Sequence, residues 1–135
     1  MTQDQINVAD ECAELSAAGK ISFGAVVGKL IAAGFERYHA DYSRGETTYY
    51  LPDASSHVVK WKHTVPTIAA AFLASAVEAA VRQSQRGEIK YEQFIQQTTA
   101  AGCVGYFVQI TGQRVQYFGR DGDVHTEWFP VATKK

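Results

Sequence analysis

Apolar side chains recur at helical spacing in four segments of the chain and alternate with polar side chains in six shorter segments. The helical pattern covers residues 4–18, 23–33, 66–86 and 90–101. The alternating pattern, typical of half-buried strands, covers residues 38–42, 47–51, 57–62, 104–110, 113–118 and 123–129. Glycines follow all four helical segments, and Ser22 stands where it can cap the second one. The pattern therefore predicts helix, helix, strand, strand, strand, twice in succession.

The two predicted units also resemble each other in sequence. Residues 19–57 match residues 87–125 at a constant offset of 68, without a gap. The identical pairs are Gly19/Gly87, Ile21/Ile89, Ala32/Ala100, Ala33/Ala101, Gly34/Gly102, Tyr38/Tyr106, Tyr49/Tyr117, Asp53/Asp121 and His57/His125. Self-similarity at a fixed period indicates a repeated unit. We expect one domain, 1–135, built from two repeats at about 4–63 and 64–130 and related by a pseudo-twofold axis.

The expected fold class is α+β, with a largely antiparallel sheet packed against the helices. A two-residue turn at Thr111-Gly112 would place Tyr106 opposite Tyr117 and Val108 opposite Val115. The repeated tyrosines then belong to the core face of the sheet. The opposite face is expected to carry a mixed polar and aromatic set: His39, Asp41, Thr48, Tyr50, His57, Phe107, Gln109, Gln116, Phe118, His125 and Glu127.

A solvated face needs few aromatic side chains, so Tyr50, Phe107 and Phe118 favour an interface on this second face. A ligand cleft or a second layer of the fold would use the same side chains. The assignment of faces depends on the turn registers, because a slip of one residue reverses the two faces of a strand.

Composition narrows the class of partner. The formal net charge of −1 gives no electrostatic attraction to nucleic acid or to an anionic membrane, so neither is expected as a partner. The first residues lack the pattern of a secretory signal, and the longest apolar run, 68–80, is too short to span a bilayer. Cys12 and Cys103 are interpreted as buried free thiols in a reducing compartment, with a disulfide between them as the alternative. We therefore expect a cytoplasmic protein.

Several segments of the second unit resemble a known bacterial family. They are residues 87–94 (GEIKYEQF), 100–103 (AAGC), 105–108 (GYFV), 115–120 (VQYFGR) and 122–130 (GDVHTEWFP), with 48–50 (TYY) in the first unit. The chain resembles the domain-of-unknown-function family DUF1398 over most of its length. Members are sometimes labelled phage envelope proteins. The resemblance implies no activity, no cofactor and no catalytic residue.

The repeated histidines are the sharpest polar signal, because both units keep His57 or His125 just after a turn that contains an aspartate. Histidine serves as a general base, a metal ligand or a pH switch. The structural alternative is a hydrogen bond to the backbone of its own turn. A metal set of His39, Asp41 and His57 has no spacing signature, so neither a metal nor a cofactor is expected.

Two hypotheses follow. The first is a non-catalytic module that uses the aromatic sheet face for self-association, as a homodimer, or for binding another protein. The second is a small-molecule-binding protein or enzyme with a pocket at the junction of the two repeats, lined by Tyr38, His57, Tyr106 and His125. No residue can be assigned a catalytic role from the sequence.

Overall fold

A computed structural model describes residues 1–129 and has the α+β architecture expected from the sequence. The helices are α1 (Gln3–Ala17), α2 (Phe23–Ala33), α3 (Ala74–Gln85) and α4 (Tyr91–Ala100). The strands are β1 (Arg37–Asp41), β2 (Glu46–Tyr50), β3 (Ser56–Lys60), β4 (Cys103–Gln109), β5 (Arg114–Gly119) and β6 (Val124–Trp128). Two helices followed by three strands thus occur twice along the chain. That the halves derive from one duplicated unit stays a prediction.

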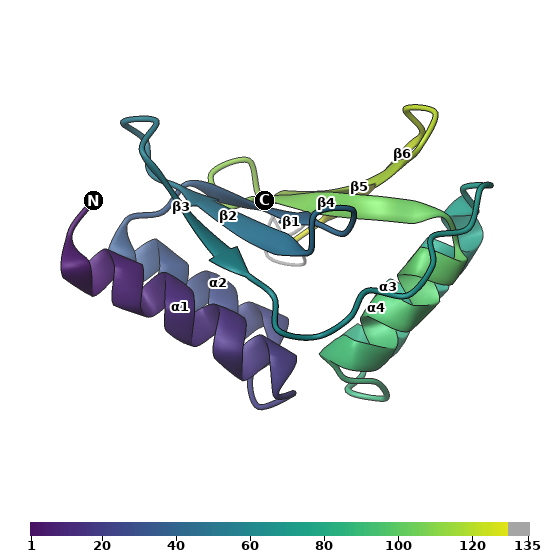
Figure 1. The fold of residues 1–135 in the computed structure, drawn as a ribbon, viewed down its shortest axis with the longest axis horizontal. Helices are drawn as coiled ribbons and strands as arrows, with labels where there is room; N and C mark the ends of the chain where they lie inside the picture. Colours follow the sequence, from purple (N-terminus) through teal and green to yellow (C-terminus); the bar gives the residue numbers. More distant parts are fainter. Residues whose placement is uncertain (130–135) are drawn as a thin grey trace.

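The six strands form one antiparallel sheet in the order β3-β2-β1-β4-β5-β6. The two meanders meet at the centre, where β1 pairs with β4 and His39 lies opposite Phe107. Figure 1 shows all four helices on one side of the sheet, α1 and α2 under the first meander and α3 and α4 under the second. Among residues 1–129, no helix lies on the other side of the sheet.

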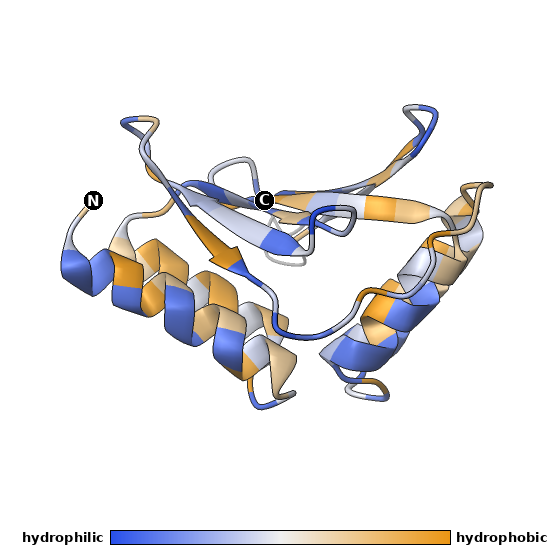
Figure 2. Cartoon of the chain, in the orientation of Figure 1, coloured by the Kyte–Doolittle hydropathy of each residue, from blue (hydrophilic) through white to orange (hydrophobic). Residues whose placement is uncertain are grey.

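Local sequence explains where the first two helices begin and end. Thr2 and Gln5 form a capping box at the start of α1, and the Ser22 hydroxyl accepts a hydrogen bond from the Ala25 N–H at the start of α2. Gly34 ends α2 in the left-handed conformation, with φ of 93°. In Figure 2 hydrophilic and hydrophobic residues alternate along these helices, as expected when one side packs on a sheet.

The predicted registers of the central strands are confirmed. Tyr106 lies opposite Tyr117 and Val108 opposite Val115 across β4 and β5. On β1 and β2 the same arrangement places Tyr38 opposite Tyr49. The helix-side face of the four central strands is buried, as predicted, and contributes these residues to the core: Tyr38, Ala40, Thr47, Tyr49, Tyr106, Val108, Val115 and Tyr117.

The prediction of a long third helix from Pro66 is wrong, because α3 begins at Ala74. The preceding residues instead bond to the end of α4: the Ala69 N–H donates to the Thr99 carbonyl and the Leu73 N–H to the Ala101 carbonyl. Phe72 packs where Gly119 leaves room for its ring. Small and apolar residues allow this segment to lie close to the end of α4, and they are equally compatible with a helix. Periodicity alone therefore placed the start of α3 too early.

The predicted face of the outer strands is also wrong. His57 lies opposite Tyr49 and His125 opposite Tyr117, so both histidines point to the helix side, and Glu127 does so too. The loops before β3 and β6 fix this register through hydrogen bonds from Leu51 N–H to the Ser55 carbonyl and from Gly119 N–H to the Asp123 carbonyl. A shift of the register by one residue at each loop moves the side chains of the strand to the opposite face of the sheet.

Candidate functional site

The open face of the sheet has an aromatic centre. His39 on β1 stacks on Phe107 on β4, with ring centroids 4.3 Å apart and planes at 8°. Phe118 meets Phe107 edge-on at 6.2 Å. Burial lowers the pKa of His39, so its imidazole is mainly uncharged at neutral pH and stacks as a neutral ring. This cluster joins the two halves of the sheet at their junction.

Further apolar and aromatic groups extend this surface toward both edges. The Arg37 guanidinium lies 4.0 Å from the centre of the Tyr50 ring, and that of Arg114 lies 5.0 Å from the Trp128 ring. Val58, Val124 and Trp128 are about half exposed. We name this surface, residues 37, 39, 50, 58, 107, 118, 124 and 128, the open aromatic face. The predicted interface residues Tyr50, Phe107 and Phe118 all belong to it.

The charges on this face are separated along the strands. At one end of the central strands Asp41 lies beside Glu46, which forms ion pairs with Lys60 at 2.8 Å and Arg44 at 3.1 Å. Asp41 has no ion-pair partner among residues 1–129. At the other end of these strands lie Arg37, which is four residues before Asp41 on β1, and Arg114 on β5. Arg37 forms an ion pair with Glu36 at 3.1 Å, so within residues 1–129 the charges of this face without an ion-pair partner are Asp41 at one end and Arg114 at the other.

The helix side of the sheet holds a cluster of tyrosines at the junction of the two halves. The Tyr38 and Tyr49 rings lie 5.4 Å apart, and so do those of Tyr106 and Tyr117. All four side chains are at least nine-tenths buried. Burial raises the pKa of Tyr38, and the neighbouring phenols of Tyr106 and Tyr49 raise it further. Across β1 and β4 Tyr38 lies opposite Val108 and Tyr106 opposite Ala40, so the two tyrosines are diagonal neighbours at the junction.

Hydrogen bonding divides the buried tyrosines into two kinds. The Tyr42 hydroxyl bonds to the Thr98 hydroxyl on α4 at 2.9 Å. In the part of the chain that the structure describes, the hydroxyls of Tyr38, Tyr49, Tyr106 and Tyr117 have no hydrogen-bond partner. Although the four rings are buried, none of these hydroxyl oxygens is among the fully buried atoms without a partner, so each keeps some contact with solvent. They can therefore accept hydrogen bonds from, or donate them to, a bound molecule.

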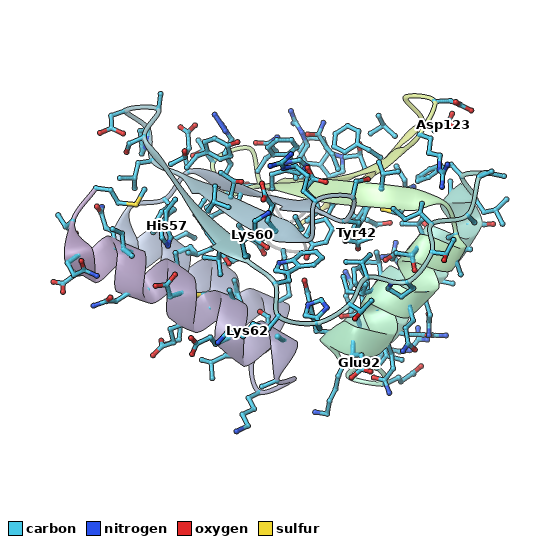
Figure 3. The ribbon with its side chains drawn as sticks, in the orientation of Figure 1. Tyr42, His57, Lys60, Lys62, Glu92 and Asp123 are labelled. Carbon is cyan, nitrogen blue, oxygen red and sulfur yellow. The ribbon has the colours of Figure 1, made fainter. Side chains whose placement is uncertain are left out.

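Trp61 and His63, which follow β3, form an aromatic group with Tyr91 of α4 next to this cluster. Trp61 stacks on His63 at 5.0 Å, and Tyr91 at the start of α4 meets both rings edge-on. The Trp61 ring is 6.0 Å from Tyr42, which Figure 3 shows beneath the sheet between the two helix pairs. Trp61 lies in the predicted strand 57–62 and Tyr91 in the predicted helix 90–101, but no pattern in the sequence indicates that their rings meet.

The two repeated histidines lie at opposite edges of the sheet and do not share a pocket. β3 and β6 are the outer strands of the six, about 24 Å apart by ordinary strand spacing. His57 bonds through Nε2 to Asp10 of α1 at 2.8 Å (Figure 3), and His125 bonds to Glu127 at 2.6 Å. Neither histidine bonds to the backbone of its own turn, so that structural alternative is wrong as well.

The predicted metal set is not assembled, because His39 and Asp41 lie on the open aromatic face side and His57 on the helix side. A different group comes together at the edge of the second half: Glu78 of α3 with His125 and Glu127 of β6. They line a hollow of about 400 Å³ with Arg82, whose guanidinium bonds to Glu127 at 2.9 Å. The sequence contains one indication of this site: Asp10 and Glu78 are both acidic and are separated by 68 residues, the same offset that relates His57 to His125.

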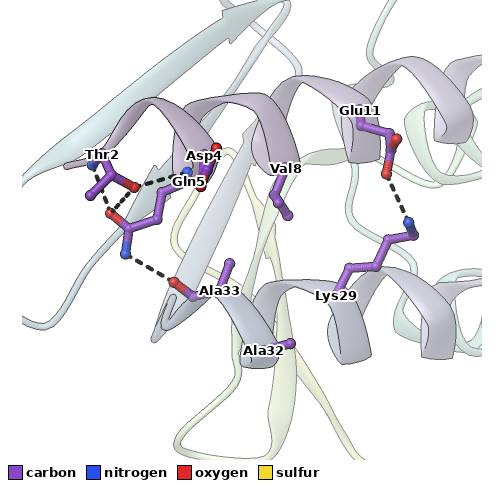
Figure 4. Close-up of a pocket in the computed structure, with 8 residues that line it drawn as sticks. All are labelled: Thr2, Asp4, Gln5, Val8, Glu11, Lys29, Ala32 and Ala33. Carbon is purple, nitrogen blue, oxygen red and sulfur yellow. Dashed lines mark hydrogen bonds and ion pairs between the residues drawn. The ribbon is translucent and has the colours of Figure 1, made fainter.

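Another hollow, of about 460 Å³, lies in the groove between α1 and α2 (Figure 4). Its two ends are tied by contacts between the helices, Gln5 with the Ala33 carbonyl at 2.9 Å and Glu11 with Lys29 at 2.7 Å. Small side chains, Ala32 and Ala33, form much of its floor. These contacts explain how the helices are held together, and the groove presents no convergent set of catalytic groups.

Comparison with protein-family models assigns residues 6–127 to the family described as "Protein of unknown function (DUF1398)". The match covers nearly the whole chain, so this protein belongs to that family, as the resemblance in its second half indicated. No curated protein matches the chain. Among residues 1–129, no helix combines the length and the apolar character needed to cross a membrane.

Proposed function

We propose that this protein is a non-catalytic module that forms a homodimer through its open aromatic face. The observation that carries the proposal is a stacked aromatic centre, His39 on Phe107, with half-exposed apolar side chains at both edges of the sheet. No helix of the described part of the chain covers that side. Exposed apolar surface of this kind usually marks an interaction site.

A second copy of the same chain is the partner that fits the charges. A twofold axis parallel to the sheet and perpendicular to the strands would stack the two aromatic centres. The same axis would bring the end of each copy that carries Asp41 over the end of the other copy that carries Arg37 and Arg114. Asp41 of one copy then faces Arg37 of the other, twice per dimer. Two sheets packed face to face with such an isologous contact keep the aromatic rows inside.

The size of the sheet sets the expected affinity. Six strands and about five residues per strand give a flat area of about 500 Å² per copy at ordinary strand and residue spacing. Two copies would bury about 1,000 Å², near the lower limit for a specific interface. We therefore propose a dimer that forms in the micromolar range rather than a permanent one.

We also propose that the two halves descend from one duplicated unit. Its support is that strand pairs correspond at the offset of 68: Tyr38 with Tyr49 matches Tyr106 with Tyr117, and Tyr49 with His57 matches Tyr117 with His125. A bacterial, cytoplasmic setting is part of the proposal. The two cysteines support it, since both are buried and unpaired in the described structure.

The direct experiment is charge exchange at the proposed contact. Asp41→Arg alone and Arg37→Asp alone should each weaken the dimer, because each would place like charges face to face. The double exchange should restore the dimer. Ile31→Asp is the matched control, since Ile31 is exposed on α2, away from the face, and should leave the dimer intact. Dissociation constants from sedimentation would decide; a double variant as weak as the single ones would contradict the proposed geometry.

A second candidate function is supported by the tyrosine hydroxyls without partners. We propose, as the alternative, that Tyr38 and Tyr106, with Tyr49 and Tyr117, bind a small molecule rich in hydrogen-bonding groups at the junction of the halves. His57 and His125 no longer belong to this candidate site, because they lie at the sheet edges. Native mass spectrometry of freshly purified protein tests it: an added mass that is lost in the Tyr38→Phe, Tyr106→Phe double variant supports the alternative, and a bare chain mass counts against it.

A further inference from the structure

The edge of the second half brings three metal-ligand side chains together. The donor atoms of Glu78, His125 and Glu127 lie within 4.8 Å of one another. They come from two elements, α3 and β6, that pack side by side. The His125 and Glu127 side chains are 18% and 11% exposed, and that of Glu78 is half exposed. A water-accessible hollow opens on the same residues.

We propose that Glu78, His125 and Glu127 bind a divalent first-row metal ion, with Zn²⁺ as its representative. One imidazole nitrogen and two carboxylate oxygens are a ligand set that such ions accept, at about 2.0–2.2 Å each. With these bond lengths neighbouring ligand atoms of a tetrahedral site lie about 3.3 Å apart. Glu78 has to close the remaining distance, and its half-exposed side chain is free to do so. The hollow leaves the fourth position to water.

Arg82 fits this site as a positioning residue. Its guanidinium bonds to Oε1 of Glu127 at 2.9 Å, which leaves Oε2 of the same carboxylate turned toward His125 at 2.6 Å. Hydrogen bonds of this kind commonly orient ligating carboxylates. Arg82 also lies 3.5 Å from Glu78, and this contact would have to loosen when the ion binds. The arginine therefore orients one ligand and competes for another.

Within the described residues, the corresponding edge of the first half has a histidine and one acid but no third metal-ligand side chain. At the offset of 68, His57 corresponds to His125 and Asp10 to Glu78, and the pair bonds at 2.8 Å between β3 and α1. The counterpart of Glu127 is Val59. A histidine and one acid are thus enough to hold a helix to the edge strand. The second half thus adds one nearly buried carboxylate, Glu127, which the structure places between Arg82 and His125.

The experiment is Zn²⁺ binding to the full-length chain, measured by competition with a chromophoric chelator. We expect one Zn²⁺ per chain. His125→Ala and Glu127→Gln should each weaken binding by about tenfold or more, whereas His57→Ala should leave it unchanged. Arg82→Gln should change binding less than the ligand variants do, because it removes both the contact that orients Glu127 and a positive charge next to the ion. Glu78→Gln is the variant least able to disturb folding, since its side chain is half exposed, and it too should weaken binding.

Either of two results would overturn the assignment. One is that the wild-type chain takes up no Zn²⁺; the other is that His57→Ala and His125→Ala weaken binding equally, which would indicate adventitious surface binding. Circular dichroism of each variant separates loss of the site from loss of the fold. The assignment does not depend on dimerisation, because the three residues lie on the helix side of β6 and at α3.

Discussion

Replacing buried tyrosines by phenylalanine, one at a time, distinguishes hydroxyls that support the fold from hydroxyls that do not. Tyr42 and Tyr38 are both at least nine-tenths buried on the helix side of β1 or just after it. The Tyr42 hydroxyl donates to Thr98 Oγ1 at 2.9 Å, while Thr98 itself donates to the Phe94 carbonyl at 2.8 Å. The Tyr38 hydroxyl has no partner within residues 1–129. The same substitution therefore removes one hydrogen bond at Tyr42 and none at Tyr38.

The expected magnitudes follow from this difference. Tyr42→Phe should lower the free energy of unfolding by about 1 kcal/mol, the net value of a buried hydrogen bond, because Thr98 keeps its own donor bonded. For a chain of 135 residues this is a fall in Tm of about 4 °C. Tyr38→Phe should change the free energy of unfolding by less than about 0.5 kcal/mol, since it removes a hydroxyl that has no protein partner within residues 1–129 and keeps some contact with solvent.

Urea unfolding followed by tryptophan fluorescence measures both values. Trp61 lies 6.0 Å from Tyr42 and is expected to report on this part of the core. The slope of unfolding free energy against urea should be the same in all variants, which shows that only stability has changed. Equal destabilisation by Tyr38→Phe and Tyr42→Phe would refute the reasoning. It would mean that the Tyr38 hydroxyl has a structural partner and is not available to a ligand.

Two further predictions concern the fold. Gly102→Ala should destabilise the protein by about 3 kcal/mol or more, because φ is 83° there and a Cβ would collide with the Ala71 carbonyl. Gly24→Ala, in open space on α2, should stabilise the protein by about 0.5–1 kcal/mol. Thermal melts compare the two variants, and similar melting temperatures would contradict this prediction. Burial raises the pKa of the Cys103 thiol from 9.0 to about 11, so its contribution to stability is complete below pH 9 and is lost as the pH rises toward 11. Urea titrations between pH 8 and pH 10 should show stability falling more steeply in the wild type than in Cys103→Ala, and parallel curves would be the contrary result.

The fold was largely predictable because its signals are local. Helical and alternating periods located the elements, and Ser22 and Gly34 fixed the limits of α2 through backbone preferences that act within a few residues. The start of α3 was not predictable in this way. Residues 68–73 are apolar enough for a helix, and their extended path depends on hydrogen bonds to Thr99 and Ala101, about thirty residues later.

The candidate sites were predictable only where they lie on regular strands. Phe107, Phe118 and Tyr50 were placed on the correct face because the registers of the central hairpins follow from short turns. His57 and His125 were misplaced because longer loops set the register of the outer strands. The helix acids near them are Asp10, which bonds to His57, and Glu78, which lies close to His125. Both occupy helix positions that look solvated in the sequence, and only the three-dimensional packing brings them to the histidines.

Sedimentation of the wild-type chain over a range of micromolar concentrations, beside the Phe107→Asp variant, tests the proposed self-association most directly. Phe107 lies at the centre of the open aromatic face, stacked on His39 and partly exposed, so the substitution should disrupt the face without unfolding the core. The account predicts a wild-type mass that rises with concentration toward twice the chain mass of 14.8 kDa, and a folded variant that stays at 14.8 kDa. A wild-type chain that remains monomeric throughout, or a variant that dimerises as strongly as the wild type, would contradict it.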